Sequence, residues 1–132
     1  MNVIYQRVIW LATGPTVHRA QIIQPQQYWK RIPREHSVGM LMLQMYHLSS
    51  GSDLIIEGSN TLDAWFEITR VSGASWTADD KFVGIGLSSS YPLSDGNDHL
   101  WDVIRWRWAP TLGSSTFTNQ SVCFEGQMVT KP

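Results

Sequence analysis

The residues of this chain that could support nucleophilic or metal chemistry are one cysteine and four histidines. Cys123 would need a nearby histidine and an orienting polar group to act as a nucleophile. It lies in the alternating segment VCFEG, where we predict that it is a buried thiol serving as a small apolar residue. None of the histidines has a metal-ligand spacing such as HxH or HExxH; they are His18, His36, His47 and His99. We therefore predict no catalytic residue, no cofactor and no enzymatic activity.

One loop carries oxygen ligands of the kind that calcium accepts. Asp95, Asn97 and Asp98 surround Gly96 and offer carboxylate and amide oxygens. The loop lacks the spacing and the bidentate Glu of an EF-hand, and Asp, Gly and Asn form such turns without a metal. We predict a turn, and keep calcium at Asp95, Asn97 and Asp98 as the weaker alternative.

Composition restricts the class of protein. The chain has 132 residues, enough for one domain over 1–132, and no internal repeat or second-domain boundary is visible. Only 16% of the residues are charged and the net charge is -1, which gives no general attraction to nucleic acid or to an acidic membrane. Seven tryptophans in so short a chain indicate either a generous core or a surface that a partner covers.

The cysteine count and the first residues bear on where the protein is made. A single cysteine excludes an intramolecular disulfide. The opening MNVIYQRVIW has no basic region followed by an unbroken apolar stretch, so we read it as a strand instead of a signal peptide. No apolar run approaches the roughly 20 residues that cross a bilayer. We expect synthesis in the cytoplasm without a signal peptide, and no membrane partner.

The clearest strand pattern is Trp101–Trp108, WDVIRWRW. Ile104, Trp106 and Trp108 share one face of such a strand, and Arg105 and Arg107 share the other. The aromatic face predicts a core. For the two arginines we favour a cross-strand ion pair or a cation–π stack over a ligand-reading pair.

Further strands follow at short intervals, separated by turn signals. We expect Gly84 and Gly86 to leave room for a neighbouring backbone or a large ring. Ser37–Leu48 is apolar on both faces, which predicts a central strand covered on both sides. Between Pro25 and Pro33 we expect an irregular connection with one helical turn. The other expected strands are Val3–Leu11, Val17–Gln24, Leu54–Gly58, Ala64–Val71, Lys81–Leu87, Ser114–Thr118 and Val122–Val129.

This pattern predicts an all-β protein, an antiparallel β-sandwich of jelly-roll type with eight or nine strands. Two segments strengthen the assignment, and a third is compatible with it. The run Gly58-Ser59-Asn60, followed by Asp63 and Trp65, resembles the Gly-Ser-Asn turn of discoidin-like, galactose-binding-like jelly rolls. DVIRWR resembles a later strand of that family, and Val122–Gly126 its closing strand.

The same pairing is similar to small jelly-roll proteins among phage virion components. Discoidin domains are usually secreted and often have a disulfide, whereas this chain has one cysteine and Thr61-Leu62-Asp63 in place of the usual turn residues. These differences favour the virion-like relatives. The resemblance therefore implies a jelly roll, and it says little about a ligand.

We hypothesise a non-enzymatic structural protein that self-assembles or decorates a larger particle, such as a phage or virus-like virion, or forms a filament. Its partners would be copies of itself or other assembly proteins, without nucleic acid, and its location the assembled particle. The alternative is a discoidin-type module that binds carbohydrate or another ligand. The candidate interface or ligand contacts are Tyr28, Trp29, Trp76, Tyr91, Trp101, Arg105 and Arg107.

Overall fold

The computed structural model describes residues 2–13, 22–75, 81–88, 101–110 and 119–132, which form nine strands and two short 3-10 turns. The strands are β1 (Asn2–Thr13), β2 (Ile22–Ile23), β3 (Lys30–Arg31), β4 (Val38–Leu48), β5 (Ser52–Ser59), β6 (Phe66–Ser72), β7 (Lys81–Ser88), β8 (Val103–Pro110) and β9 (Asn119–Lys131). The turns are η1 (Gln26–Tyr28) and η2 (Gly73–Ser75). No helix in these described ranges is long and apolar enough to span a membrane.

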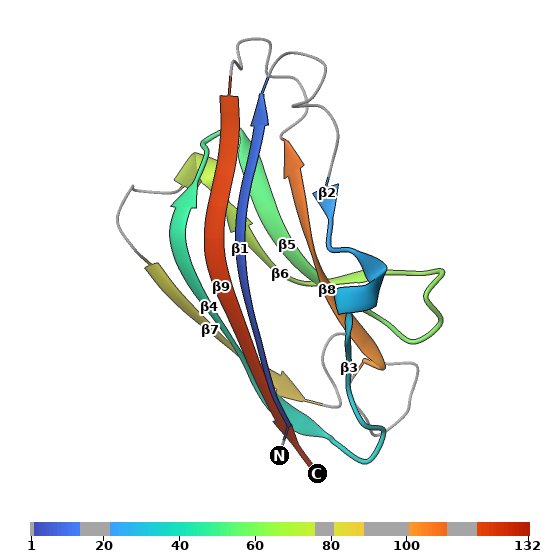
Figure 1. Ribbon diagram of the computed structural model, residues 1–132. Coiled ribbons are helices and arrows are strands. Elements are labelled where there is room, and N and C mark those ends of the chain that lie inside the picture. The colour runs from blue at the N-terminus through green and yellow to red at the C-terminus, as the bar shows by residue number, and fades with distance from the viewer. Residues whose placement is uncertain (1, 14–21, 76–80, 89–100, 111–118) are drawn as a thin grey trace.

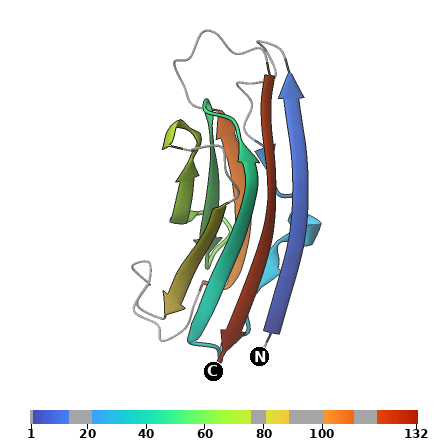
Figure 2. The ribbon, with the colours of Figure 1, turned by 90° about the vertical axis from the view of Figure 1, so that its left-hand side faces the viewer.

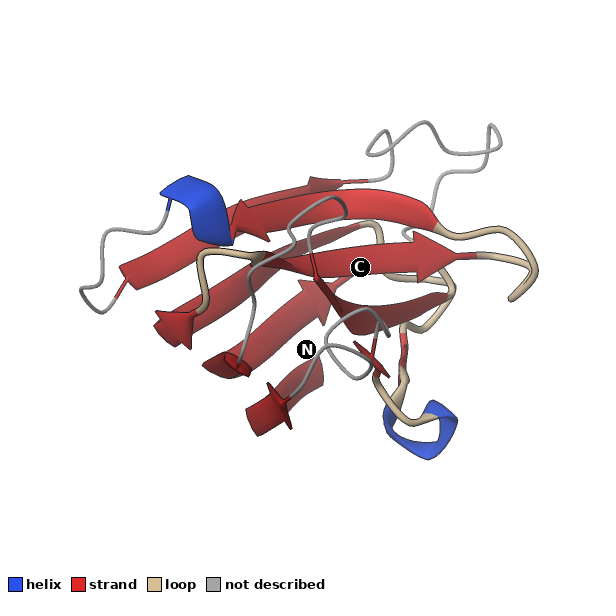
Figure 3. Cartoon of the chain, turned by 90° about the horizontal axis from the view of Figure 1, so that it is seen from above, coloured by secondary structure: helices blue, strands red, loops and turns tan. Residues whose placement is uncertain are grey.

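The strands form two antiparallel sheets that pack face to face (Figures 1 and 2). One sheet has the order β1-β9-β4-β7, and the other has β2-β8-β5-β6 with the short β3 added beside β8. If β3 is set aside, successive strands cross between the sheets except for the hairpin of β5 and β6. This is the double Greek-key arrangement of a jelly roll, which confirms the predicted fold class. The view from above shows the two layers of strands (Figure 3).

The β8 strand has the two faces that its sequence predicts. Trp106 and Trp108 are buried in the core cluster between the sheets, together with Ile104. Phe124 from the opposite sheet meets the Trp106 ring edge-on, with centroids 5.8 Å apart. Because a β-strand alternates its side chains, Arg105 falls on the outer face of the five-stranded sheet. The tryptophans therefore hold the two layers together.

Trp101 lies just before β8 and is buried too, at 6% exposure. Its ring stacks on Phe66 at 5.0 Å, with 12° between the planes. A Cβ on Gly58 would come within 2.5 Å of the Trp101 ring, so only glycine leaves room for the indole there. The expectation that a glycine accommodates a large ring was correct in kind, but it was assigned to the wrong strand.

The glycines of β7 have a different surrounding from the one expected. Gly84 and Gly86 are exposed, and a Cβ on Gly86 would meet no atom within 4 Å. Their register partners on β4 are Met42 and Met40. The prediction of a neighbouring ring or backbone was wrong for Gly86, which leaves open space on the outer surface of the four-stranded sheet.

The β4 strand is central in its sheet, between β9 and β7, as predicted. The prediction that β4 is covered on both sides was wrong. Leu41, Leu43 and Met45 are buried against the other sheet, but Met40 is 45% exposed and Met42 is half-buried. A jelly roll has only two layers, so the second apolar face of β4 turns outward, and nothing within the described chain covers it fully.

Several other expectations can be compared directly with the structure. The connection after Pro25 does contain one helical turn, η1. Of the expected strand Val17–Gln24, Ile22–Ile23 is a strand, while 17–21 lie outside the described residues. The expected strand Ser114–Thr118 also lies outside them. Cys123 is half-exposed on the outer side of β9, so its predicted burial was wrong.

Candidate functional site: two outer surfaces

A buried carboxylate lies on the outer face of the five-stranded sheet and holds two arginines from the neighbouring strand. Glu57 of β5 is 4% exposed and lies opposite Arg105 of β8 in register. Arg105 donates from Nε to Glu57 Oε1 at 2.7 Å, and Arg107 donates from Nε to Oε2 at 3.2 Å. The cross-strand ion pair expected for these arginines is therefore present, with Glu57 as the shared acceptor.

Two tryptophans cover Arg105 from above the sheet. The Arg105 guanidinium carbon lies 3.6 Å from the centroid of the Trp65 ring and 5.0 Å from that of Trp29. The two indoles also meet each other edge-on, with centroids 4.9 Å apart. The expected cation–π contact is thus present, and its geometry makes Arg105 a support beneath the aromatic rings. We call Trp29, Trp65, Arg105 and Glu57 the aromatic–arginine cluster.

Gln24 ties the η1 connection to β8. Its backbone N–H donates to the carbonyl of Trp106, and its side-chain Oε1 accepts from the Trp106 N–H at 3.1 Å. Its Nε2 donates to the carbonyl of Tyr28, and its own carbonyl accepts from Trp29 Nε1 at 2.7 Å. Gln24 is buried, so these bonds form in low dielectric and fix the turn firmly. Tyr28 is left 51% exposed at the tip of a rigid turn.

The Gly-Ser-Asn turn positions Trp65. Ser59 Oγ accepts from the N–H of Thr61 and of Leu62, where the backbone enters the left-handed region at φ 67°. Trp65 Nε1 donates to the carbonyl of Leu62 at 3.1 Å. Asn60 Oδ1 accepts from the Asp102 N–H at 3.0 Å. The two segments that carried the family resemblance are therefore joined directly, one turn bracing the start of β8.

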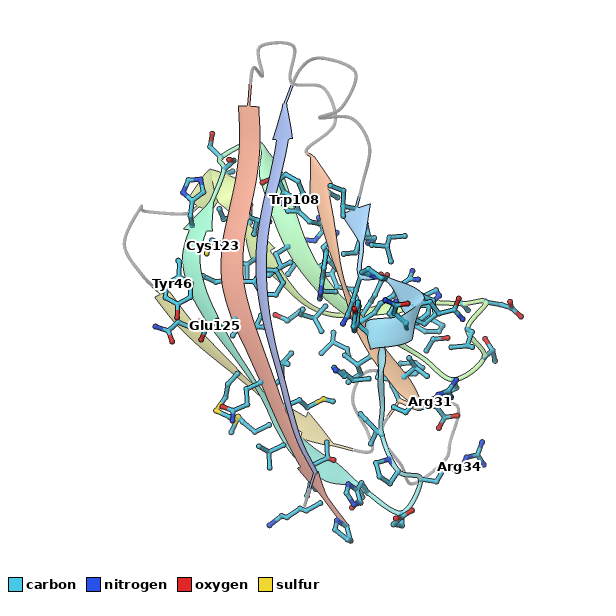
Figure 4. The ribbon with its side chains drawn as sticks, viewed as in Figure 1. Arg31, Arg34, Tyr46, Trp108, Cys123 and Glu125 are labelled. Atoms are coloured by element: carbon cyan, nitrogen blue, oxygen red, sulfur yellow. The ribbon has the colours of Figure 1, made fainter. Side chains whose placement is uncertain are left out.

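The second surface is the outer face of the four-stranded sheet, which we call the methionine–glycine face. It combines exposed Met40 with half-buried apolar side chains and with the two exposed glycines of β7. Figure 4 shows Tyr46, Cys123 and Glu125 over this sheet. Its apolar and glycine members are Met40, Met42, Tyr46, Gly84, Gly86, Cys123 and Val129, and the polar residues Gln44, Glu125 and Gln127 share the face.

The structure brings together only some of the candidate contact residues. Tyr28, Trp29, Arg105 and Arg107 gather at one surface. Trp101 does not join them, because it is buried beneath Phe66. The remaining candidates, Trp76, Tyr91, Asp95, Asn97 and Asp98, lie outside the described residues. Within the described part, no group of three His, Cys, Asp or Glu side chains could hold a metal.

Sequence reasoning missed two residues of the aromatic–arginine cluster as site members. Glu57 was not predicted to be a site residue, although a lone carboxylate inside the apolar strand LIIEG indicates a buried ion pair. Trp65 was used only as part of a turn motif. Neither strand pairing nor loop proximity could be derived from periodicity, so the partner of each residue stayed open.

Comparisons with known proteins place the fold. No family model matches the chain, and no curated protein matches it. It is similar to the crystal structure of the infectious bursal disease virus VP2 subviral particle, with a TM-score of 0.57 and 11% identity over 96% of this chain and 31% of that one. The structure of the Gx strain of the same virus gives a TM-score of 0.53 at 11% identity, covering 98% of this chain and 32% of that chain.

The chain thus spans about a third of these viral chains. A carbohydrate-binding module, CBM28, specific for non-crystalline cellulose, has a TM-score of 0.45 at 6% identity over 98% of this chain and 87% of that one. Identities this low concern the fold alone. The β-sandwich of jelly-roll type is therefore established, and a discoidin assignment in particular is not.

Proposed function

We propose that this chain is a non-enzymatic structural domain that assembles with copies of itself or with a larger particle, such as a virion or a filament. One observation carries the proposal: the second apolar face of β4 lies uncovered in a two-layer fold. Met40 is 45% exposed beside half-buried Met42 and the open space at Gly86. Exposed apolar side chains gathered in this way are typical of a surface that a partner covers.

The chemistry of the methionine–glycine face suits protein contact. Methionine is unbranched and adapts to an irregular neighbour. The glycines of β7 remove side chains next to Met40 and Met42, which lets another backbone or ring approach the sheet closely. Glu125 and Lys131 of β9 lie on either side of the apolar patch around Met40 and Met42, which fits an interface with an apolar centre and a polar rim. The jelly roll that the chain shares with the VP2 subviral particle is a scaffold on which such a surface can be presented.

The test compares two lysine variants with the unaltered chain by light scattering after size exclusion. Met40→Lys places a charge on the methionine–glycine face, whereas Ala74→Lys adds the same charge at exposed η2. We expect Met40→Lys to lower the mass of the assembly and Ala74→Lys to leave the assembly unchanged. Equal masses for all three proteins would show that this face is not the contact.

A ligand-binding module remains the second candidate, and the aromatic–arginine cluster favours it. Tyr28 is exposed at its edge, and rings fixed by hydrogen bonds suit stacking on a sugar face. Retardation in gels containing soluble polysaccharides tests this function. If the chain binds a polysaccharide and Tyr28→Ala abolishes that binding without altering the fold, the ligand-binding module is supported. The surface around Tyr28 would then bind a ligand instead of another subunit.

A further inference from the structure

The first strand forms an unusual sheet edge. β1 is the outermost strand of the four-stranded sheet and pairs with β9 from Asn2 to Thr13 without a register shift. Its sequence NVIYQRVIWLAT contains one charge, Arg7, and neither proline nor lysine. An edge strand exposes a row of backbone donors and acceptors, and native proteins normally guard it with charges, prolines, bulges or short length. β1 has almost none of these protections.

The other described edges are better guarded. β7 is shorter, begins at Lys81 and contains two glycines, which weaken strand pairing. β6 carries Glu67 and Arg70, and β2 has two residues. The contrast points to β1 as the edge at which a further strand adds.

A second copy of this chain is the partner that such an edge fits. Two identical strands related by a two-fold axis pair antiparallel, so each supplies the length and the hydrogen-bonding groups that the other needs. Figures 1 and 2 place η1, with its exposed Tyr28, at the same edge of the sandwich as β1. The second copy would thus meet Tyr28 beside the joined strands.

The register of the joined strands is restricted by the core. Val8 lies opposite buried Phe124 in register, and Arg7 lies opposite half-exposed Glu125. A slip of one residue would put core-side positions of one copy beside outer positions of the other. Two registers near the middle of β1 avoid this mismatch of faces. One pairs Arg7 with Arg7, and the other pairs Val8 with Val8. Like charges directly opposite each other are destabilising, so the second register is favoured.

We propose that two copies of this chain join their β1 strands antiparallel about a two-fold axis at Val8, forming one continuous sheet. Arg7 of each copy then lies opposite Ile9 of the other, and Val3 opposite Thr13. The joined sheet also unites the two methionine–glycine faces into one larger surface. The inference rests on the proposed function, because it names a second copy as the partner and adds a contact at β1 to the one at the methionine–glycine face.

Disulfide trapping tests the register, in a chain whose own thiol has been removed by Cys123→Ser. Opposed positions in an antiparallel pair are about 5 Å apart and diagonal ones about 7–8 Å, while a disulfide requires Cα atoms within about 7 Å. We expect an equimolar mixture of Arg7→Cys and Ile9→Cys to give a mixed disulfide on mild oxidation, and each variant alone to give little. Ala74→Cys at exposed η2 is the control and should stay reduced.

Circular dichroism of each reduced variant first establishes that the sandwich is folded. A self-linked Arg7→Cys dimer would overturn the Val8-centred register. A folded chain that forms no mixed disulfide on β1, although it still assembles, would overturn the inference while the assembly proposal stands. A chain that sediments as a monomer at every concentration would instead overturn the proposed function itself.

Discussion

Glu57 and Arg105 are opposed residues of β5 and β8 whose side chains meet at 2.7 Å on a face of the sheet that also carries two tryptophans. Their side chains are 5% and 11% exposed, so the pair is nearly desolvated. A carboxylate in that position is stabilised only by its cations, and each cation by the carboxylate. The pair therefore fixes the register of the two strands beneath the loops that carry Trp29 and Trp65.

Removal of the Glu57 charge tests this arrangement. Glu57→Gln removes the negative charge that Arg105 and Arg107 share, and we expect a loss of about 3 kcal/mol in the free energy of unfolding. Urea denaturation measures the loss. Glu67→Gln is the matched control, because its partner Arg70 is well exposed, and it should cost less than about 1 kcal/mol. Equal losses in the two variants would contradict a special role for Glu57.

The close packing of Trp101 against Gly58 can be tested by adding a single methyl group. Gly58→Ala places a methyl group within 2.5 Å of the Trp101 ring, so the indole or the strand must move. We expect a destabilisation of about 2 kcal/mol, as for other overpacked sites. Gly86→Ala is the comparison, since its Cβ meets nothing within 4 Å, and its thermal midpoint should be close to that of the unaltered chain.

We expect the Trp65 side chain to hold the β5–β6 loop against η1. Trp65→Ala removes the ring that lies 3.6 Å from Arg105 and that meets Trp29. We predict a stability loss of about 1–2 kcal/mol from these aromatic and cation–π contacts. The exchange rate of the Trp29 indole N–H, measured by NMR, should increase, because its bond to Gln24 is then less sheltered. An unchanged exchange rate would show that η1 is held without Trp65.

Tyr28 and Trp29 are neighbours with different expected roles. Tyr28→Ala removes a side chain that is 51% exposed, and should change the stability by less than about 0.5 kcal/mol. Trp29→Ala removes the hydrogen bond to Gln24 and both aromatic contacts, and should cost about 2–3 kcal/mol. Thermal unfolding separates the two. Only Tyr28→Ala is therefore a clean probe of contacts made with a partner.

The strand pattern and the two faces of β8 could be predicted from the sequence, because a period of two with tryptophans on one side has few other solutions. The exposure of the second face of β4 could not. Apolar residues on both faces of β4 fit a strand buried in the centre and equally a strand whose second face meets another molecule. The same ambiguity explains why Cys123 on the neighbouring strand β9 was predicted to be buried, although it is partly exposed.

The partners that residues find on distant strands could not be predicted from the sequence either. Periodicity places Arg105 and Arg107 on one face but does not say which strand lies alongside, so Glu57 could be found only from the pairing of β5 with β8. The turn at Ser59 gave a better signal, because its residue types reflect local hydrogen bonding to the backbone.

The central claim is that the uncovered surfaces of this sandwich are used in assembly. Sedimentation velocity of the unaltered chain over a hundredfold range of concentration measures this directly. The account predicts a sedimentation coefficient that rises with concentration toward a dimer or a larger regular oligomer. A single species with the mass of one 15.0 kDa chain throughout the series would contradict it.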